Sequence, residues 1–172
     1  MNDKLKNLAE KRSESRRGAR VPCLFMHHIN EDRMAECIAD VKKHIMGDKE
    51  KVVIHGMQCT FYDFCVLTML ALGQMKFLEN KARSQFCIFL QKKVFKGNAP
   101  QVRTFNNHAN KDPYKGLAER LALCEADPSV KLVSQDDEGC YMAFQRIKKT
   151  FQRMDYFKEL KGLREELAKL TL

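Results

Sequence analysis

The sequence predicts an all-α protein: a compact domain of five to seven helices, with a helix-turn-helix-like pair near residues 84–110 and a long amphipathic C-terminal helix. Apolar residues recur at every third or fourth position through most of the chain, which is the period of helices with one buried face. Residues typical of helix starts and ends flank these segments. Hydrophobic residues make up 44% of the 172 positions and charged residues 31%, as in a soluble globular domain.

The chain divides into a basic arm and one domain. Residues 1–21 interleave basic side chains with serine, glutamate and glycine, so we expect a flexible N-terminal arm that lies along phosphates through Arg16 and Arg17. A solvated tail without a role is the alternative. Residues 22–172 form the predicted helical domain. Because the N-terminus lacks the apolar centre of a signal peptide and no apolar run is long enough to span a bilayer, we expect a cytoplasmic protein.

The first predicted helix has clear boundaries. It begins after Asn30, a suitable N-cap, carries apolar residues at helical spacing from Met34 to Ile45, and ends at Gly47. Residues 51–55 are a short β-branched run, which is typical of either a strand or an extended connector.

The second predicted helix should lie at the centre of the domain. Thr60 and Asp63 match the two positions of a capping box. The helix that follows over residues 61–72 is apolar nearly all round, which indicates burial on every side, and a glycine closes it. A brief helix is predicted over residues 74–82.

The helix pair comes next. Ser84 is the expected cap of an apolar-faced helix that reaches residue 95, residues 96–99 form a four-residue turn, and Pro100 takes the first position of a second short helix. This layout is typical of a helix-turn-helix, although an ordinary helical hairpin is the alternative. Another short helix stops at residues 127–128, where a proline follows an aspartate.

The last segment is the longest periodic one. Apolar residues repeat every three or four positions from Tyr141 to Leu170, after an acidic helix start near Ser134. The spacing departs from a strict heptad around residues 154–160. We interpret the stripe as intramolecular core, with a homodimer seam through the C-terminal helix as the alternative. Residues 131–144 are open to a hairpin as well, but their periodicity favours a helix.

Positive charge is concentrated on the helix pair. The chain carries 31 Lys and Arg against 22 Asp and Glu, a net charge of +9. Residues 76–115 contain nine basic and two acidic side chains, whereas residues 116–140 are net acidic. A basic block on such a pair is typical of proteins that bind nucleic acid, although lysine-rich helix faces also serve as solubilising surface.

The second helix of the pair carries the candidate binding residues. If it starts at Pro100, then Val102, Phe105 and Ala109 share an inward face. The opposite side chains suit the major groove, because Arg clamps guanine, Asn or Gln pairs with adenine, and Lys or Thr holds phosphates. We therefore expect double-stranded DNA as the partner. The predicted binding residues are Lys92, Lys93, Lys96, Gln101, Arg103, Thr104, Asn107, His108 and Lys111, with Arg16 and Arg17 of the arm.

Arg103 and His108 also form an Arg-x-x-x-x-His spacing, which resembles the motif of HEPN-type ribonucleases. The resemblance is confined to this motif, and Thr104 stands where those enzymes often carry Asn, Asp or His. It implies an all-helical domain that dimerises to bring two motifs together. It also implies metal-independent RNA cleavage, with His108 in acid–base catalysis and Arg103 stabilising the phosphorane charge. This ribonuclease is the first alternative to a DNA-binding protein.

No other residues indicate catalysis or a cofactor. Seven cysteines are scattered without a Cys-x-x-Cys pair, so we expect reduced thiols, and Cys23, His27 and His28 lack the second half of a zinc site. We expect no metal, no cofactor and binding without catalysis. The size and layout suit a regulator or accessory factor of a bacterial or mobile-element system, and a non-enzymatic helical assembly protein is the second alternative. The target sequence and the choice between DNA and RNA stay open.

Overall fold

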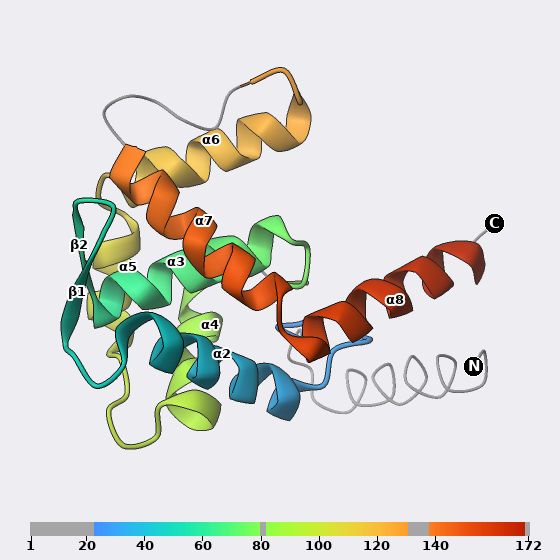
Figure 1. Ribbon diagram of the computed structural model, residues 1–172, viewed down its shortest axis with the longest axis horizontal. Coiled ribbons are helices and arrows are strands. Elements are labelled where there is room, and N and C mark those ends of the chain that lie inside the picture. Colours follow the sequence, from blue (N-terminus) through green and yellow to red (C-terminus); the bar gives the residue numbers. More distant parts are fainter. Residues whose placement is uncertain (1–22, 80–81, 131–137, 171–172) are drawn as a thin grey trace.

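The computed structural model describes residues 23–79, 82–130 and 138–170 (Figure 1). Within these ranges the chain forms seven α-helices, one π-helix and one two-stranded hairpin, so the expected all-α fold is confirmed. The arm expected at residues 1–21 lies outside them. In chain order the elements are α2 (Glu31–Met46), β1 (Lys51–Ile54), β2 (Met57–Thr60), α3 (Phe61–Gln74), α4 (Arg83–Phe89), the π-helix η1 (Leu90–Val94), α5 (Val102–Ala109), α6 (Tyr114–Ala126), α7 (Glu138–Gln152) and α8 (Asp155–Leu170).

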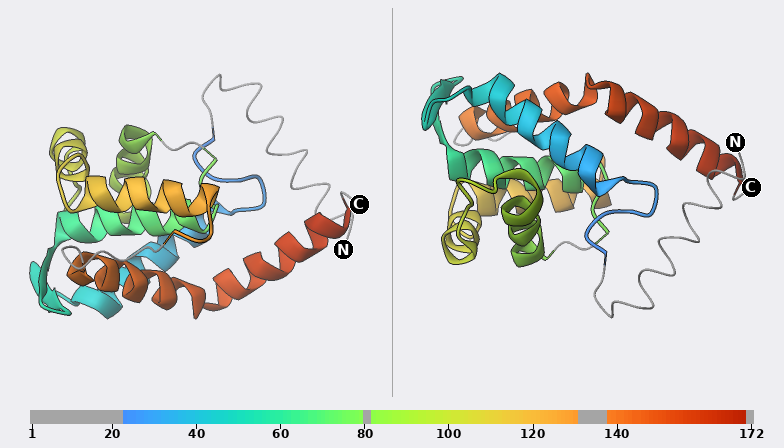
Figure 2. Two further views of the ribbon diagram at one scale, coloured as in Figure 1. Left: turned by 90° about the horizontal axis from the view of Figure 1, so that it is seen from above. Right: turned by 90° about the horizontal axis from the view of Figure 1, so that it is seen from below.

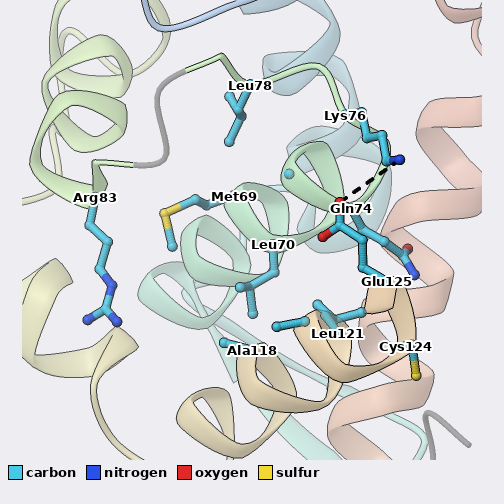
Figure 3. A pocket seen from close by; sticks show the side chains of 12 residues that line it. Met69, Leu70, Gln74, Lys76, Leu78, Arg83, Ala118, Leu121, Cys124 and Glu125 are labelled. Carbon is cyan, nitrogen blue, oxygen red and sulfur yellow. Dashed lines mark ion pairs between the residues drawn. The ribbon is translucent and has the colours of Figure 1, made fainter. Parts of the chain in front are cut away.

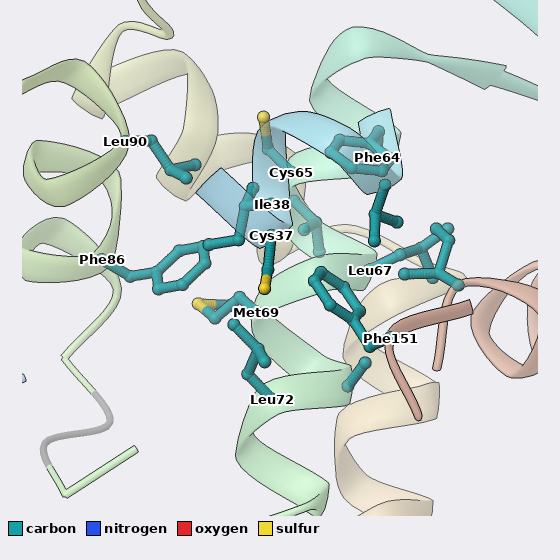
Figure 4. Close-up of a cluster of buried hydrophobic side chains, with 14 of the residues drawn as sticks. Cys37, Ile38, Phe64, Cys65, Leu67, Met69, Leu72, Phe86, Leu90 and Phe151 are labelled. Carbon is teal, nitrogen blue, oxygen red and sulfur yellow. The ribbon is translucent and has the colours of Figure 1, made fainter. Parts of the chain in front are cut away.

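Helix α3 is the centre of the fold, as its apolar sequence predicts. Its side chains from Phe64 to Leu67 have no exposed surface. Helices α7 and α2 lie on one side of α3, and α4 and α5 lie on the other (Figure 2). Ile38 of α2, Phe86 of α4 and Phe151 of α7 converge on this helix (Figure 4). Because burying each such side chain contributes about 1.5–3 kcal/mol, the cluster holds both layers against α3.

Helix caps form where the sequence predicts them. The Asn30 side chain accepts a hydrogen bond from the backbone N–H of Arg33 at 3.0 Å. The Thr60 hydroxyl accepts from the N–H of Asp63, whose carboxylate accepts from the N–H of Thr60 in return. Gly47 ends α2 with a φ of 58°, a conformation that favours glycine. Caps of this kind contribute about 1 kcal/mol each.

The β-branched run is a strand rather than a connector. Residues 51–54 pair antiparallel with residues 57–60, with Lys51 opposite Thr60 and Ile54 opposite Met57. His55 and Gly56 form the turn between them, and both have positive φ values, as tight hairpin turns require. The hairpin packs against α7 and leads directly into α3.

The brief helix expected over residues 74–82 does not form in the described part of that segment. Helix α3 continues through the expected stop at Gly73 to Gln74. The chain then pairs with residues 24–26, because the N–H of Met26 donates to the carbonyl of Phe77 and Leu78 bridges to Phe25. The adjacent residues Phe77 and Leu78 are both buried. The backbone at residues 77–78 is extended and forms hydrogen bonds with residues 24–26, so no local helix forms there.

The C-terminal periodic segment is two helices rather than one long helix. Helix α7 ends at Gln152 and α8 begins at Asp155, at the place where the apolar spacing departs from a heptad. The break lets Phe157 fold back onto Phe151, with ring centroids 5.1 Å apart. Phe151 and Leu160 have no exposed surface, so the stripe is intramolecular core here.

Of the segment left open between hairpin and helix, residues 138–144 are helical and residues 131–137 lie outside the described ranges. No helix of the described part is long and apolar enough to cross a membrane.

Candidate nucleic-acid interface

Helices α4 and α5 lie side by side and run in opposite directions. Near the start of α4, the Ser84 hydroxyl accepts a hydrogen bond from the Asn106 amide at 3.0 Å, close to the end of α5. At the other end of the pair, the Gln91 amide donates to the carbonyl of Pro100 at 2.6 Å. Ser84 is therefore a contact between helices and not the expected helix cap, since α4 begins at Arg83 with no side-chain cap.

The connection between the two helices is longer than the expected four-residue turn. It comprises residues 95–101, and Pro100 is buried two positions before the start of α5. The π-helix causes part of the difference, because its wider turn ends with the N–H of Phe95 donating to the carbonyl of Leu90 at 2.8 Å. The Phe95 ring then packs edge-on against Phe61 of α3. The pair thus has the geometry of a helical hairpin anchored to the core.

Helix α5 turns its faces as the sequence predicts. Phe105 is fully buried and Ala109 is 4% exposed, whereas Arg103, Thr104 and Asn107 are exposed. Asn107 lies one turn beyond Arg103, and Lys111 lies one turn beyond Asn107, just after the helix ends. Arg103 and Asn107 therefore share one side of the helix, and Lys111 is exposed two residues beyond its end. We call Arg103, Thr104, Asn107 and Lys111 the α5 face.

The surroundings of the α5 face are cationic. Residues 82–111 contain no Asp or Glu. Lys92 of η1 and Lys96 of the connector are exposed, and neither forms an ion pair with a described carboxylate. Lys93 differs, because its ammonium lies 3.1 Å from the carboxylate of Asp32 on α2. Lys92 and Lys96 are therefore available to a polyanion, whereas Lys93 is engaged by Asp32.

His108 belongs to a partly buried network and not to the α5 face. Its Nε2 lies 2.5 Å from the Asp63 carboxylate, which also accepts a hydrogen bond from the Tyr114 hydroxyl at 2.6 Å. Burial raises the pKa of Asp63, but hydrogen bonds from His108, Thr60 and Tyr114 outweigh it and hold that pKa below its ordinary value. An ionised carboxylate only accepts, so Nε2 of His108 carries the proton. Burial, and then the bond to Asp63, raises the pKa of Tyr114.

This network joins three helices, because Asp63 is on α3, His108 on α5 and Tyr114 on α6. It also separates the two residues of the ribonuclease-like motif. Positions five apart on an α-helix differ by about 140° around its axis, so Arg103 and His108 do not share one face of α5. Arg103 projects into solvent, whereas the His108 side chain is 34% exposed and committed to Asp63.

The other predicted residues have different environments. Gln101 stands at the N-cap position of α5, and its backbone N–H donates to the Tyr62 hydroxyl at 3.0 Å. Its side chain makes no capping bond and is exposed. Arg16 and Arg17 lie outside the described residues.

The structure has a second cationic surface, which was not predicted from the sequence. A groove of about 330 Å³ runs between α7, the last turn of α2 and the turn of the β-hairpin. Its lining includes His44, His55, Arg146, Lys149 and Arg153, which we call the α7 groove, and no carboxylate lines it. The sequence signal for this surface is the spacing of Arg146, Lys149 and Arg153, which are three and four residues apart and fall on the side away from the apolar stripe.

A separate cavity of about 530 Å³ lies between the C-terminal half of α3 and α6 (Figure 3). Met69, Leu70 and Leu121 give it an aliphatic lining. At its rim Lys76 lies 3.9 Å from Glu125, so that cation faces a carboxylate of its own. Arg83 of α4 also lines this cavity, and its guanidinium donates to the side-chain oxygen of Asn110.

The cysteines and metal-binding residue types do not form a reactive centre in the described part. All seven cysteines are free, and burial raises the pKa of Cys37 to about 11 and that of Cys59 to about 12, which keeps both as inert thiols at neutral pH. No group of three or more His, Cys, Asp or Glu among the described residues could hold a metal ion.

Comparison of the chain with family models, with curated proteins and with solved structures finds no match. The chemistry of the two cationic surfaces is therefore what indicates a function.

Proposed function

We propose that this protein binds nucleic acid, with double-stranded DNA as the first partner, through the α5 face flanked by Lys92 and Lys96. One observation carries the proposal. Helix α5 exposes Arg103 and Asn107 on one side, with Lys111 exposed just beyond its end, while Phe105 locks its other side into the core. These residues lie within a stretch of 30 residues, 82–111, that has no carboxylate.

The α5 face suits the major groove in size and chemistry. The groove is about 12 Å wide and admits an α-helix. Arg103 offers a guanidinium that pairs bidentately with guanine, and Asn107 offers an amide that pairs with adenine. Lys92, Lys96 and Lys111 are suited to phosphates, which supply most of the affinity and none of the sequence preference.

The hairpin presents this face without further ordering. The bonds from Asn106 to Ser84 and from Gln91 to Pro100 fix α5 against α4, and the bond from His108 to Asp63 fixes it against α3. A surface held in place before binding loses less conformational entropy when the partner arrives. The ordering that remains is then that of the exposed side chains on α5 and of the flanking lysines Lys92, Lys96 and Lys111.

The test is fluorescence anisotropy with labelled duplex DNA, single-stranded DNA and RNA at two ionic strengths. We expect the duplex to bind best, with affinity falling on a log–log salt plot with a slope of about −3, because Lys92, Lys96 and Lys111 supply three phosphate contacts. The double variant Arg103→Ala/Lys92→Ala should abolish duplex binding. A matched control, Lys158→Ala/Lys161→Ala, removes the same charge from exposed positions of α8 and should keep it.

Unchanged binding in the Arg103/Lys92 variant would overturn the proposal. The RNA arm separates it from the ribonuclease alternative. If the wild-type protein cleaves RNA in the presence of EDTA, and both Arg103→Ala and His108→Ala leave the RNA intact, the protein is a ribonuclease and the binding proposal is overturned. Intact RNA in the same mixture supports a binding protein.

A further inference from the structure

The α7 groove is built from segments far apart in sequence. His44 is in the last turn of α2, His55 is in the hairpin turn, Arg146 and Lys149 are on α7, and Arg153 directly follows the end of α7. All five side chains are exposed. Every ionisable group in the lining is basic, so three fixed positive charges face one groove without a carboxylate to balance them.

The neutral polar groups of the groove are already engaged within α7. The Gln145 amide donates to the Tyr141 hydroxyl at 2.7 Å, and the Thr150 hydroxyl donates to the carbonyl of Arg146 at 2.7 Å. The cations are therefore the groups left to bind a partner. Arginine and lysine without base-reading amides recognise phosphate groups and not base edges.

The α7 groove and the α5 face lie on opposite sides of the molecule. Helix α3 separates α7 from α5 in both views of Figure 2, and α3 contacts both of them. A straight duplex on the α5 face therefore cannot reach the groove. Bending 20–30 base pairs by even 40–90° costs about 1–6 kcal/mol, and passing round the molecule requires more.

We propose that the α7 groove holds the phosphate backbone of a second nucleic-acid segment, so that one protein molecule joins two segments. This inference rests on the function proposed above, in which a first segment occupies the α5 face. Contact in the groove is sequence-independent, since it is made by Arg146, Lys149 and Arg153 to phosphates alone. A groove of about 330 Å³ accommodates backbone phosphates and is too small for a whole duplex turn.

The experiment is capture of one duplex by another. A biotinylated duplex is fixed on beads, the full-length protein is added, and a fluorescent duplex of unrelated sequence is offered. We expect the wild-type protein to retain the second duplex. Lys149→Glu/Arg153→Glu should reduce its retention by about tenfold or more, because two phosphate contacts become repulsive. The same variant should keep its affinity for a single duplex, in anisotropy, within about twofold.

Lys158→Glu/Lys161→Glu is the matched control, because it makes the same change of net charge at exposed positions of α8. It should capture the second duplex as the wild type does. Light scattering of the free protein accompanies the assay. Capture that occurs only where the protein is dimeric would assign the bridging to two copies and overturn the proposal.

The failures of the two proposals are distinguishable. If a single duplex binds but no second one is captured, or if the Lys149/Arg153 variant captures normally, the groove proposal is overturned and the α5 proposal stands. If the wild type binds no duplex at all, the α5 proposal is overturned, and the groove is tested by NMR titration with a short oligothymidylate. Amide shifts confined to α7 and the hairpin turn would then support the groove, and their absence would overturn it.

Discussion

At the level of single residues, the Asp63 carboxylate joins the helices that carry the α5 face. It receives hydrogen bonds from the N–H and hydroxyl of Thr60, from His108 and from Tyr114, so four donors converge on its two oxygens. A buried carboxylate with this many donors stays ionised, and each bond to a charged group contributes about 1.5–3 kcal/mol. The position of α5 on the core therefore depends on one ionised side chain.

Asp63→Asn should lower the free energy of unfolding by about 2–4 kcal/mol at pH 7, because an amide offers one acceptor oxygen and places a donor against the other two donors. The folded pKa of Asp63 lies below its ordinary value of 3.8, so its stabilisation is complete above that value and is lost as pH falls through the folded pKa. The difference in the free energy of unfolding between wild type and variant should therefore become smaller below pH 4. Urea denaturation at pH 7, pH 5 and pH 3 measures it.

Asp40→Asn removes a carboxylate from an exposed position of α2 and is the control for the change of charge alone. It should alter the free energy of unfolding by less than about 0.5 kcal/mol. Equal stability of the two variants would mean that the network around Asp63 does not position α5.

The importance of His108 could not have been recognised from its own sequence neighbourhood. Its partner Asp63 is 45 residues away. In the sequence, Asp63 is already explained by a capping box, and His108 is already explained by the Arg-x-x-x-x-His spacing. Only packing of α5 on α3 brings them together. The exposed side of α5 was predictable, because Phe105 and Ala109 fix the helix rotation through a local pattern.

At the level of elements, the sequence predicts what local chemistry decides. The caps at Asn30 and Thr60 formed as expected because their partners lie within three residues. Two of the errors lie where distant contacts decide. Residues 77–78 pair with residues 24–26 instead of forming a helix, and the chain breaks at residues 153–154 so that Phe157 meets Phe151. The α7 groove belongs to the same class, because three elements build it.

Two glycines provide a test of these element assignments. Gly47→Ala should lower the free energy of unfolding by about 1 kcal/mol, because the φ of 58° at the end of α2 is unfavourable for a residue with a Cβ. Gly162→Ala should raise it by about 0.5–1 kcal/mol, because this glycine is inside α8 and an added Cβ meets no atom within 4 Å. Thermal and urea denaturation of the two variants should move in opposite directions. Destabilisation by Gly162→Ala would contradict a continuous α8.

At the scale of the whole molecule, the fold places cationic surfaces on both sides of a core that is closed by the C-terminal helices. The rings of Phe77, Phe151 and Phe157 meet at the start of α8. The ring centroid of Phe157 lies 5.2 Å from that of Phe77 and 5.1 Å from that of Phe151. Phe157 is 4% exposed. The same apolar stripe has two interpretations, a core within one chain and a seam between two chains, and these differ in how stability depends on protein concentration.

Phe157→Ala decides between these two interpretations. A core role predicts a loss of about 3–5 kcal/mol in the free energy of unfolding, because the variant leaves a cavity between Phe77 and Phe151. The urea midpoint of the wild type and of the variant should then be the same at low and high protein concentration. A homodimer seam instead predicts that the wild-type midpoint rises with concentration and that this dependence disappears in Phe157→Ala. Leu170→Ala, at an exposed position near the end of α8, is the control and should change the midpoint little. A concentration-dependent wild type would support the assembly protein, and a concentration-independent one leaves the opposed cationic surfaces of a single molecule to join two nucleic-acid segments.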